Sequence, residues 1–417
     1  MSVALTVAGG RVYGKVVFHG VGDAMQFQDL RGFLDLLERE DQLLEVHREV
    51  GTRFEIAAGI RKSSDVGGPA LLFNNVKGHP GWRVLGALYA TRRLVALGLG
   101  VTEDKLLERY LTLEEKRIPS EMVPTGPVKE IRWTGDDIDL EKIPIVVHSE
   151  KDCGSYITIG VQIGKDPDTR IPNVSIHRML RMGKDRLSLW APPDHHLGRM
   201  ILKAEDRGEG LEVATAIGVD PAIIIGSQAR VPYGVDEFAV AGGLYGRPVP
   251  LVKCKTVDLE VPAHAEIVLE GEISTDGWTI DEGRYGDFTG HQCSIRWNPV
   301  FKVNAITHRK NPILHTILMP WENDWLEAPP LAAAGWRALR EASIKTVAVY
   351  ATPGSSCYWH LYAAIDKRPG EGKNALMALM SLHALKLVLV TDGDVDLTDP
   401  MAVERAMAFR VQPDEDV

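Results

Sequence analysis

Hydrophobic positions in the first part of the chain follow two different periods. Between residues 27 and 39, large apolar residues recur three or four positions apart with charged residues between them, which predicts a helix with one buried face. Residues 44–50 alternate apolar with polar, and residues 70–73 form a short apolar run after a Gly-Gly-Pro turn signal, so both are predicted strands. Residues 25–125 are therefore expected to form a small α+β domain.

Shorter apolar runs broken by turn residues fill the middle of the chain, residues 126–322. Two helices are predicted among them, at 197–205 and 236–244, the first with an apolar face. Many short strands with little helix between them are typical of a barrel or a sandwich, which makes this segment a β domain. The predicted strands are residues 156–163, 187–190, 222–225, 250–256, 265–270 and 301–307.

Helices and strands alternate in the last part of the chain, residues 323–417. This alternation is typical of a separate α/β domain, here a short one, so the whole chain is predicted to be an α+β multidomain protein. The predicted order is a helix at 331–342, strands at 345–350 and 358–365, a helix at 373–385 and a strand at 387–391.

Composition narrows the class of protein. At 417 residues, the chain exceeds what one hydrophobic core usually organises. Its 57 acidic against 47 basic residues give a net charge of -10, which argues against a nucleic-acid partner. The four cysteines form no CxxC pair and favour a reducing compartment, which we take to be the cytoplasm. No apolar run approaches the roughly 20 residues of a membrane helix, so no membrane span is expected.

Four segments of the predicted β domain are dense in polar residues that a core would not select. Glu282 and Asp287 lie five positions apart around glycines that permit a tight turn. Each segment also has a structural explanation, such as a turn cap, a surface ion pair or a solvated hairpin tip. The pair His195 and His196 is explained either by metal binding or by a surface hydrogen bond. The four segments are residues 173–178, 193–196, 234–237 and 281–287.

In this order the segments resemble the UbiD family of decarboxylases, and the resemblance runs from about Met25 to Val417. In that family a central split β-barrel of the flavin-reductase type holds prenylated flavin mononucleotide (prenyl-FMN), between an N-terminal α/β domain and a C-terminal α/β oligomerisation domain. The resemblance implies the same three parts here. It rests on NxSIxR from Asn173, the following His196, PxGVxE ending at Glu237, DLEVPA from Asp258, EIVLEG from Glu266 and EGxYGDxTG ending at Gly290.

The resemblance also implies how the cofactor is held. Asn173, His196 and Glu237 would bind a divalent metal, Mn²⁺ or else Mg²⁺, that holds the flavin phosphate; oxygen and imidazole ligands suit such an ion. A potassium ion is expected against the backbone near Ser227 and Ala229, with Glu237 bridging the two ions. The cofactor-binding residues implied are Thr158, Asn173, Val174, Ser175, Ile176, His177, Arg178, His195, His196, Ser227 and Gln228.

Three residues are implied as catalytic: Arg178, Glu282 and Asp287. The reaction would be a reversible, non-oxidative decarboxylation through a covalent adduct with prenyl-FMN, which acts as the electron sink. Arg178 would orient the substrate carboxylate and bond to Glu282, and Asp287 would protonate the carbon after CO₂ leaves. The substrate is expected to be an aromatic, heteroaromatic or α,β-unsaturated acid. Family members with Asp at position 287 favour the first two, and a second carboxylate on the substrate would give Arg284 a partner.

Two alternatives stay open at this point. The enzyme could act as a carboxylase in vivo, or the chain could be a subunit of a heteromeric UbiD-type complex, although the intact catalytic residues argue against a degenerate subunit. A flavin prenyltransferase is implied as the source of the cofactor, and a homodimer or homohexamer as the assembly.

The substrate pocket is expected between residues 316–325 and 355–360, where Trp321, Trp325 and Trp359 either wall the pocket or pack in the core.

The two ends of the chain carry separate expectations. Residues 1–24 lack the basic opening and long apolar region of a signal peptide, so we interpret them as an extension before an alternative start at Met25. Family members continue beyond the position of Val417 with a segment that can include a lysine facing the cofactor. Either this chain is a short variant or a partner chain completes it.

Overall fold

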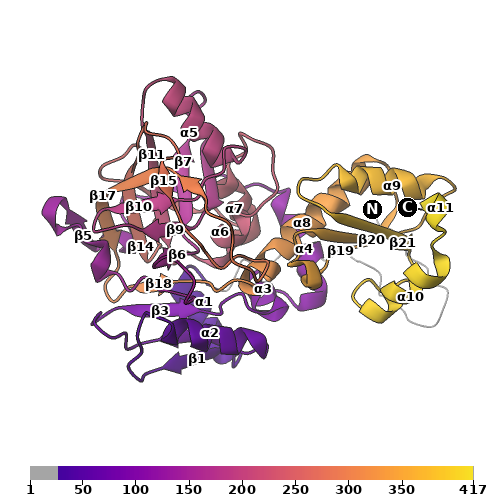
Figure 1. Cartoon of the computed structure of the whole chain (residues 1–417), viewed down its shortest axis with the longest axis horizontal. Coiled ribbons are helices and arrows are strands. Elements are labelled where there is room, and N and C mark those ends of the chain that lie inside the picture. The colour runs from indigo at the N-terminus through magenta and orange to yellow at the C-terminus, as the bar shows by residue number, and fades with distance from the viewer. Residues whose placement is uncertain (1–26, 417) are drawn as a thin grey trace.

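The computed structural model describes residues 27–416, so the predicted extension 1–24 and the start at Met25 lie outside the described part. A large body holds the first and middle parts of the chain and a smaller body holds its end; the long helix α8 (Glu322–Glu341) leads from one to the other (Figure 1). Among residues 27–416, no helix combines the length and the hydropathy needed to cross a bilayer.

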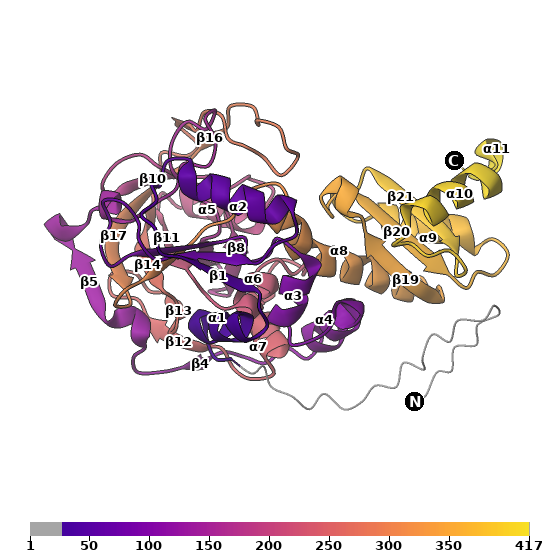
Figure 2. The same cartoon turned by 90° about the horizontal axis from the view of Figure 1, so that it is seen from below.

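A four-stranded sheet in the order β1-β2-β3-β18 organises the first part of the chain. Helices α1 and α2 cover its opposite faces, because α1 clusters with Leu72 and α2 clusters with the neighbouring Leu71 (Figure 2). Strand β18 comes from the far end of the middle part and pairs in parallel with β3. The elements are α1 (Leu30–Arg39), β1 (Leu43–Val46), α2 (Glu55–Asp65), β2 (Ala70–Phe73), β3 (Arg83–Gly86), α3 (Arg92–Gly98), α4 (Leu106–Glu114) and β18 (Ile313–His315).

A curled nine-stranded sheet forms the middle part, in the order β6-β9-β10-β17-β14-β11-β7-β8, with β5 paired to β17. Every neighbouring pair of this sheet is antiparallel. Among the described strands no ladder joins β6 to β8, so the split-barrel description stays a prediction. The strands are β5 (Ile131–Thr134), β6 (Tyr156–Ile157), β7 (Val161–Lys165), β8 (Pro172–Ile176), β9 (Met179–Arg181), β10 (Arg186–Leu189), β11 (Leu211–Ile217), β14 (Ile267–Ile273) and β17 (Val300–His308).

Shorter elements decorate this sheet, and three of them are helices. Helix α5 and helix α7 lie where the sequence predicts helices. The elements are α5 (His196–Asp206), α6 (Pro221–Gly226), α7 (Glu237–Tyr245), a sheet of β4 (Glu121–Met122), β12 (Pro250–Lys253) and β13 (Glu260–Pro262), and the pair β15 (Ile280–Asp281) and β16 (Trp297–Asn298).

Residues 222–225 form a helix, so the predicted strand is wrong. Helix α6 begins after Asp220, whose Oδ1 accepts a hydrogen bond from the backbone N–H of Ala222 at 2.9 Å. Pro221 suits the first helical position because the N–H that it lacks has no partner there. The run is buried on all sides, so its periodicity could not separate helix from strand, and the Asp-Pro start signal decides it.

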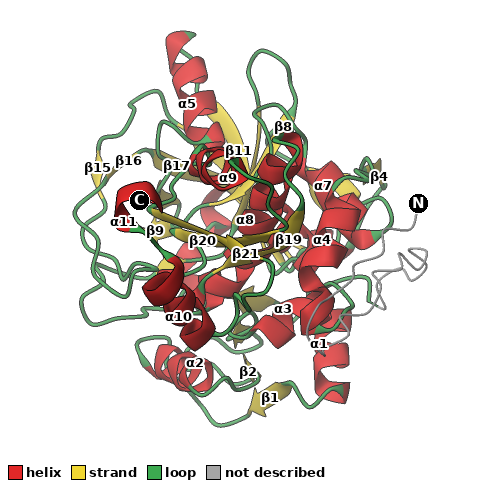
Figure 3. Cartoon of the chain, turned by 90° about the vertical axis from the view of Figure 1, so that its right-hand side faces the viewer, coloured by secondary structure: helices red, strands yellow, loops and turns green. Residues whose placement is uncertain are grey.

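A three-stranded sheet in the order β19-β20-β21 forms the C-terminal body. Its two faces are covered by α9 and α10, because Leu361 of β20 clusters with α9 and Ala364 clusters with α10 (Figure 3). Helix α8 begins at Glu322, earlier than the predicted helix at 331–342. The elements are β19 (Thr346–Ala351), β20 (His360–Ile365), α9 (Glu371–Met380), β21 (Leu387–Asp392), α10 (Pro400–Arg410) and α11 (Pro413–Asp416).

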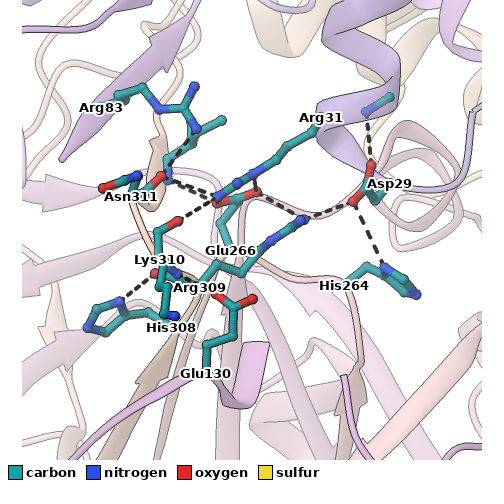
Figure 4. Close-up of polar contacts among 12 residues, drawn as sticks. Asp29, Arg31, Arg83, Glu130, His264, Glu266, His308, Arg309, Lys310 and Asn311 are labelled. Atoms are coloured by element: carbon teal, nitrogen blue, oxygen red, sulfur yellow. Dashed lines mark hydrogen bonds and ion pairs between the residues drawn. The ribbon is translucent and has the colours of Figure 1, made fainter. Parts of the chain in front are cut away.

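One buried carboxylate ties the first part of the chain to the middle part (Figure 4). Arg31 of α1 donates from Nε and Nη2 to the two oxygens of Glu266, at 2.7 and 2.8 Å, and Nη1 of Arg309 lies 3.3 Å from the first of these oxygens. The other oxygen accepts from the backbone N–H of Ile313, the first residue of β18, at 3.1 Å. Glu266 therefore fixes α1 and β18 against the start of β14.

Candidate active site

Two side chains from separate parts of the middle region form a buried ion pair. Arg178 follows β8, and Glu282 follows β15. The guanidinium donates from Nε and Nη2 to the two oxygens of Glu282, each at 2.7 Å, and the Glu282 side chain has no exposed surface. The rings of Trp190 and Tyr285 lie 5.0 and 4.9 Å from the guanidinium carbon. Burial alone would lower the pKa of Arg178, but the bonds to Glu282 raise it well above its usual value, so Arg178 stays charged.

A tight turn connects Glu282 to Asp287. Gly283 adopts a positive φ of 74°, and a Cβ at this position would lie 2.8 Å from the Cβ of Cys153, so both the backbone and the space require glycine. The backbone N–H of Asp287 donates to the carbonyl of His291 at 2.8 Å and closes the far side of the turn. The two carboxylates therefore sit at the two ends of one constrained segment.

A cavity of about 440 Å³ lies between this turn and helix α2. Asp287 lines it; Arg178 and Glu282 do not, but Tyr285 contacts both the cavity and Arg178. Arg284, for which the sequence left a substrate contact open, is exposed and lies outside these walls. The walls are Phe54, Ala57, Ala58, Arg61, His148, Ser149, Glu150, Asp152, Tyr285, Gly286, Asp287, Gly290, His291, Gln292, Leu318, Met319, Pro320 and Trp321.

The three tryptophans considered from the sequence have different positions. Trp321 lines the cavity. Trp325 packs against the main hydrophobic core, and Trp359 lies under the Lys386 ammonium, whose nitrogen is 3.4 Å from the ring centroid. Of the three, Trp321 is the one that lines this cavity.

Helix α2 supplies a wall of the cavity that sequence reasoning missed. Its residue Arg61 stacks on the ring of Trp321 at 4.0 Å and donates from Nε to Asp65 at 2.8 Å. The helical period of the apolar residues in α2 could have located the helix, but not the cavity, because the opposite wall lies far away in the sequence. Among the cavity walls, Arg61 is the one arginine or lysine, beside the acids Glu150, Asp152 and Asp287.

Thr158, predicted to contact the cofactor, belongs to a buried network that ends at the cavity. Its hydroxyl lies 3.0 Å from that of Thr316 and accepts the backbone N–H of Ile317 at 2.8 Å. Thr316 in turn lies 2.8 Å from Nε2 of His148, a cavity wall. Burial lowers the pKa of His148 to about 4, so this imidazole is neutral at pH 7.

The three predicted metal ligands meet in space. Nδ2 of Asn173 donates to Oε1 of Glu237 at 3.1 Å, and Nδ1 of His196 lies 3.8 Å from the same oxygen. The three come from β8, the start of α7 and the start of α5. A half-turn of the Asn173 amide would direct its oxygen to the same point, giving two oxygen donors and one imidazole. This set fits Mn²⁺ or Mg²⁺, and the metal itself stays a prediction.

Most of the predicted cofactor residues surround this cluster. The backbone N–H of Val174 donates to Glu237 at 2.9 Å, and the Ser175 hydroxyl lies 3.1 Å from Oδ1 of Asn173 and 3.0 Å from Nε2 of His177. The rings of His177 and His195 are 6.0 Å apart. Ile176 follows Ser175 in strand β8. The structure thus brings the segment 173–178 and both histidines of the 195–196 pair to one place.

The residues predicted near a potassium ion lie at the end of α6. The Ser227 hydroxyl donates to the carbonyl of Ile224 at 2.7 Å, and the backbone N–H groups of Gln228 and Ala229 bond within the same turn. Among residues 27–416, no hydrogen bond joins Ser227 or Gln228 to Glu237. The potassium site therefore stays a prediction.

Comparisons with known proteins match almost the whole chain. Three domain models of the 3-octaprenyl-4-hydroxybenzoate carboxy-lyase match the chain: the N-terminal domain at residues 34–114, the Rift-related UbiD domain at 121–321 and the C-terminal domain at 324–417. Anhydromevalonate phosphate decarboxylase of Methanothermobacter thermautotrophicus is 36% identical over 93% of this chain and 89% of its own length. Phenolic acid decarboxylase of Bacillus subtilis is 33% identical over 94% and 86%.

A solved structure is similar over nearly the same span. An evolved dimeric form of the UbiD-class enzyme HmfF from Pelotomaculum thermopropionicum, in complex with prFMN, superimposes with a TM-score of 0.89 at 39% identity, covering 94% of this chain and 91% of that one. The ranges matched by the first two domain models, 34–114 and 121–321, contain the buried ion pair, the cavity walls and the cluster around Glu237. On this evidence the chain belongs to the UbiD family.

Proposed function

We propose that this protein is a prenyl-FMN-dependent decarboxylase of an aromatic, heteroaromatic or α,β-unsaturated carboxylic acid. The observation that carries the proposal is the buried Arg178–Glu282 pair beside a cavity that Asp287 lines. Relatives named as decarboxylases of a phenolic acid and of anhydromevalonate phosphate, and a similar enzyme solved with prFMN, support it. We further propose a homodimer or homohexamer that receives its cofactor from a flavin prenyltransferase.

We propose a task for each catalytic side chain. Prenyl-FMN, when bound, supplies an electron sink for the carbon that loses CO₂. Arg178 orients the substrate carboxylate; its guanidinium is fixed by two bonds to Glu282 and by contact with Trp190 and Tyr285, so little reorganisation is needed. Asp287 faces the cavity and gives a proton to the carbon once CO₂ has left.

The residues around Glu237 would hold the cofactor. Asn173, His196 and Glu237 would bind the divalent ion, and the ion would hold the phosphate, since an acidic chain needs a cation there. Ser175, His177 and His195 lie next to these ligands and would contact the flavin.

Release of CO₂ tests the proposal directly. Protein reconstituted anaerobically with prenyl-FMN is incubated with aromatic, heteroaromatic and cinnamic-type acids, and CO₂ is measured beside an Asp287→Asn variant. We expect release from at least one class of acid and loss of about 10²–10⁴-fold in the variant, the range for a general acid. No release from any acid, with the cofactor bound and visible by its absorbance, would contradict the proposal.

Replacement of Arg61 by alanine is expected to raise the KM for the anionic substrate by roughly fivefold with little change in kcat. The cavity walls carry three acids, and the half-exposed Arg61 offsets their repulsion, an effect on the order of 1 kcal/mol for a solvated charge. The difference should shrink at 0.5 M salt because the charge is screened. Asp65→Asn, which removes only the partner of Arg61, is the matched control and should not raise KM.

A further inference from the structure

We propose that Asp152 is a positioning residue, which holds the proton-donating Asp287 in place through the backbone of Gly286. This inference rests on the proposed function only for the role of Asp287. Asp152 lies in the loop 149–153, which the sequence reasoning did not single out, and it lines the cavity beside Asp287. Its side chain contacts the backbone of the turn 282–287, so its effect on the reaction is indirect.

Loop 149–153 is hydrogen-bonded to every second residue of the turn 282–287. Oδ1 of Asp152 accepts the backbone N–H of Gly286 at 2.9 Å. The backbone N–H of Cys153 donates to the carbonyl of Arg284 at 3.1 Å, and the Cys153 thiol donates to the carbonyl of Glu282. Two consecutive residues therefore hold positions 282, 284 and 286, which span the distance between the two catalytic carboxylates.

Both oxygens of Asp152 act as acceptors, which identifies it as a structural anchor. Oδ2 accepts the backbone N–H of Ser149 at 3.0 Å, and the backbone N–H of Asp152 donates to the carbonyl of Ser149 at 3.2 Å. The carboxylate thus closes its own loop with one oxygen and holds Gly286 with the other. Burial raises the pKa of Asp152, and the two backbone N–H groups that it accepts oppose this rise. Because both oxygens are engaged with backbone groups, the carboxylate is placed to hold the loop and the turn together.

The position of Gly286 makes this contact consequential. It is the residue between Tyr285, whose ring contacts Arg178, and Asp287, whose carboxylate faces the cavity. Loss of the Asp152 contact leaves the Gly286 N–H without this acceptor and loosens the backbone just before Asp287. The N–H of Asp287 stays bonded to the carbonyl of His291, and Glu282 keeps its two bonds to Arg178. The predicted defect is therefore in proton delivery, with the ion pair left intact.

Asp152→Ala is expected to lower kcat by about 10- to 100-fold, the scale for a misplacement of about 1 Å, with KM and cofactor absorbance nearly unchanged. Asp152→Asn retains one acceptor oxygen and should recover much of the lost rate, and the fall in rate at high pH that marks deprotonation of the proton donor should be preserved. The matched control is Asp139→Ala, which also removes a carboxylate that accepts a backbone N–H, that of Glu141 at 2.9 Å, outside the cavity.

The contacts of Asp152 and Cys153 with the turn 282–287 form a clamp, and hydrogen exchange tests this clamp without any assay of activity. The segment 283–288 should exchange faster in Asp152→Ala than in the wild type and in Asp139→Ala. Unchanged exchange would overturn the clamp, whatever the substrate of the enzyme proves to be. Faster exchange with unchanged kcat would overturn the positioning role. An Asn variant that is as slow as the Ala variant and has lost the fall in rate at high pH would make Asp152 itself the proton donor. If the wild type releases no CO₂ and Asp152→Ala still exchanges faster than the wild type, the proposed reaction is rejected and the clamp is not.

Discussion

Glu282→Gln is expected to lower kcat/KM by about 10²–10⁴-fold while the cofactor still binds. Glutamine has nearly the same shape, but its amide nitrogen would face Nη2 of Arg178, donor against donor, in place of one of the two 2.7 Å bonds. The guanidinium would then lose the orientation that the carboxylate gives it, and its charge would be left buried without a full counter-charge. Single-turnover CO₂ release is the measurement, because it isolates the chemical step.

Arg178→Lys provides the matched comparison. It keeps the positive charge and removes the planar fork that binds Glu282 with two bonds, so a loss similar to that of Glu282→Gln would assign the effect to geometry rather than to charge. Arg284→Ala is the negative control, because Arg284 is exposed beside the same turn. Wild-type rates in Glu282→Gln would contradict the role of the ion pair.

Glu266→Ala is expected to lower the free energy of unfolding by about 3–5 kcal/mol, the usual cost of removing one partner from a buried ion pair. Two arginines, Arg31 and Arg309, would lose their carboxylate, and the N–H of Ile313 would lose its acceptor. Arg31→Ala should cost less, because Arg309 still compensates the buried charge. Denaturant unfolding followed by tryptophan fluorescence measures both variants.

The control for that experiment lies on the same strand. Glu272 of β14 is exposed, so Glu272→Ala should change the free energy of unfolding by less than about 0.5 kcal/mol. A Glu266→Ala variant that unfolds at the same denaturant concentration as this control would show that α1 and β18 are held without the carboxylate.

Sequence alone located elements whose period is clear. The predicted strand 70–73 has the bounds of β2, and the predicted helix 197–205 differs from α5 by one residue at each end. It failed where all sides of a segment are buried, as in α6, because a run of four apolar residues has no polar face to reveal its period. There the cap at Asp220 decides the structure.

The candidate site was recoverable from sequence only where a motif carried it. Arg178 and Glu282 are 104 positions apart, and Asn173 and Glu237 are 64 apart, so no local pattern joins them; the resemblance to a family did. Sequence analysis did not identify Arg61 as a cavity wall or Asp152 as an anchor, because their roles arise from the packing of α2 and of one loop against the turn. Such contacts depend on tertiary structure and leave no signature in a single sequence.

Strand β18 has a consequence for synthesis of the chain on the ribosome. The edge of β3 that it covers stays open until residues 313–315 have been made, long after β1, β2 and β3. An exposed strand edge is a template for wrong pairing, so the nascent chain carries an aggregation hazard over most of its elongation. A fragment that ends at residue 125 would keep that edge open permanently, and chaperone binding during translation should therefore concentrate before β18 emerges.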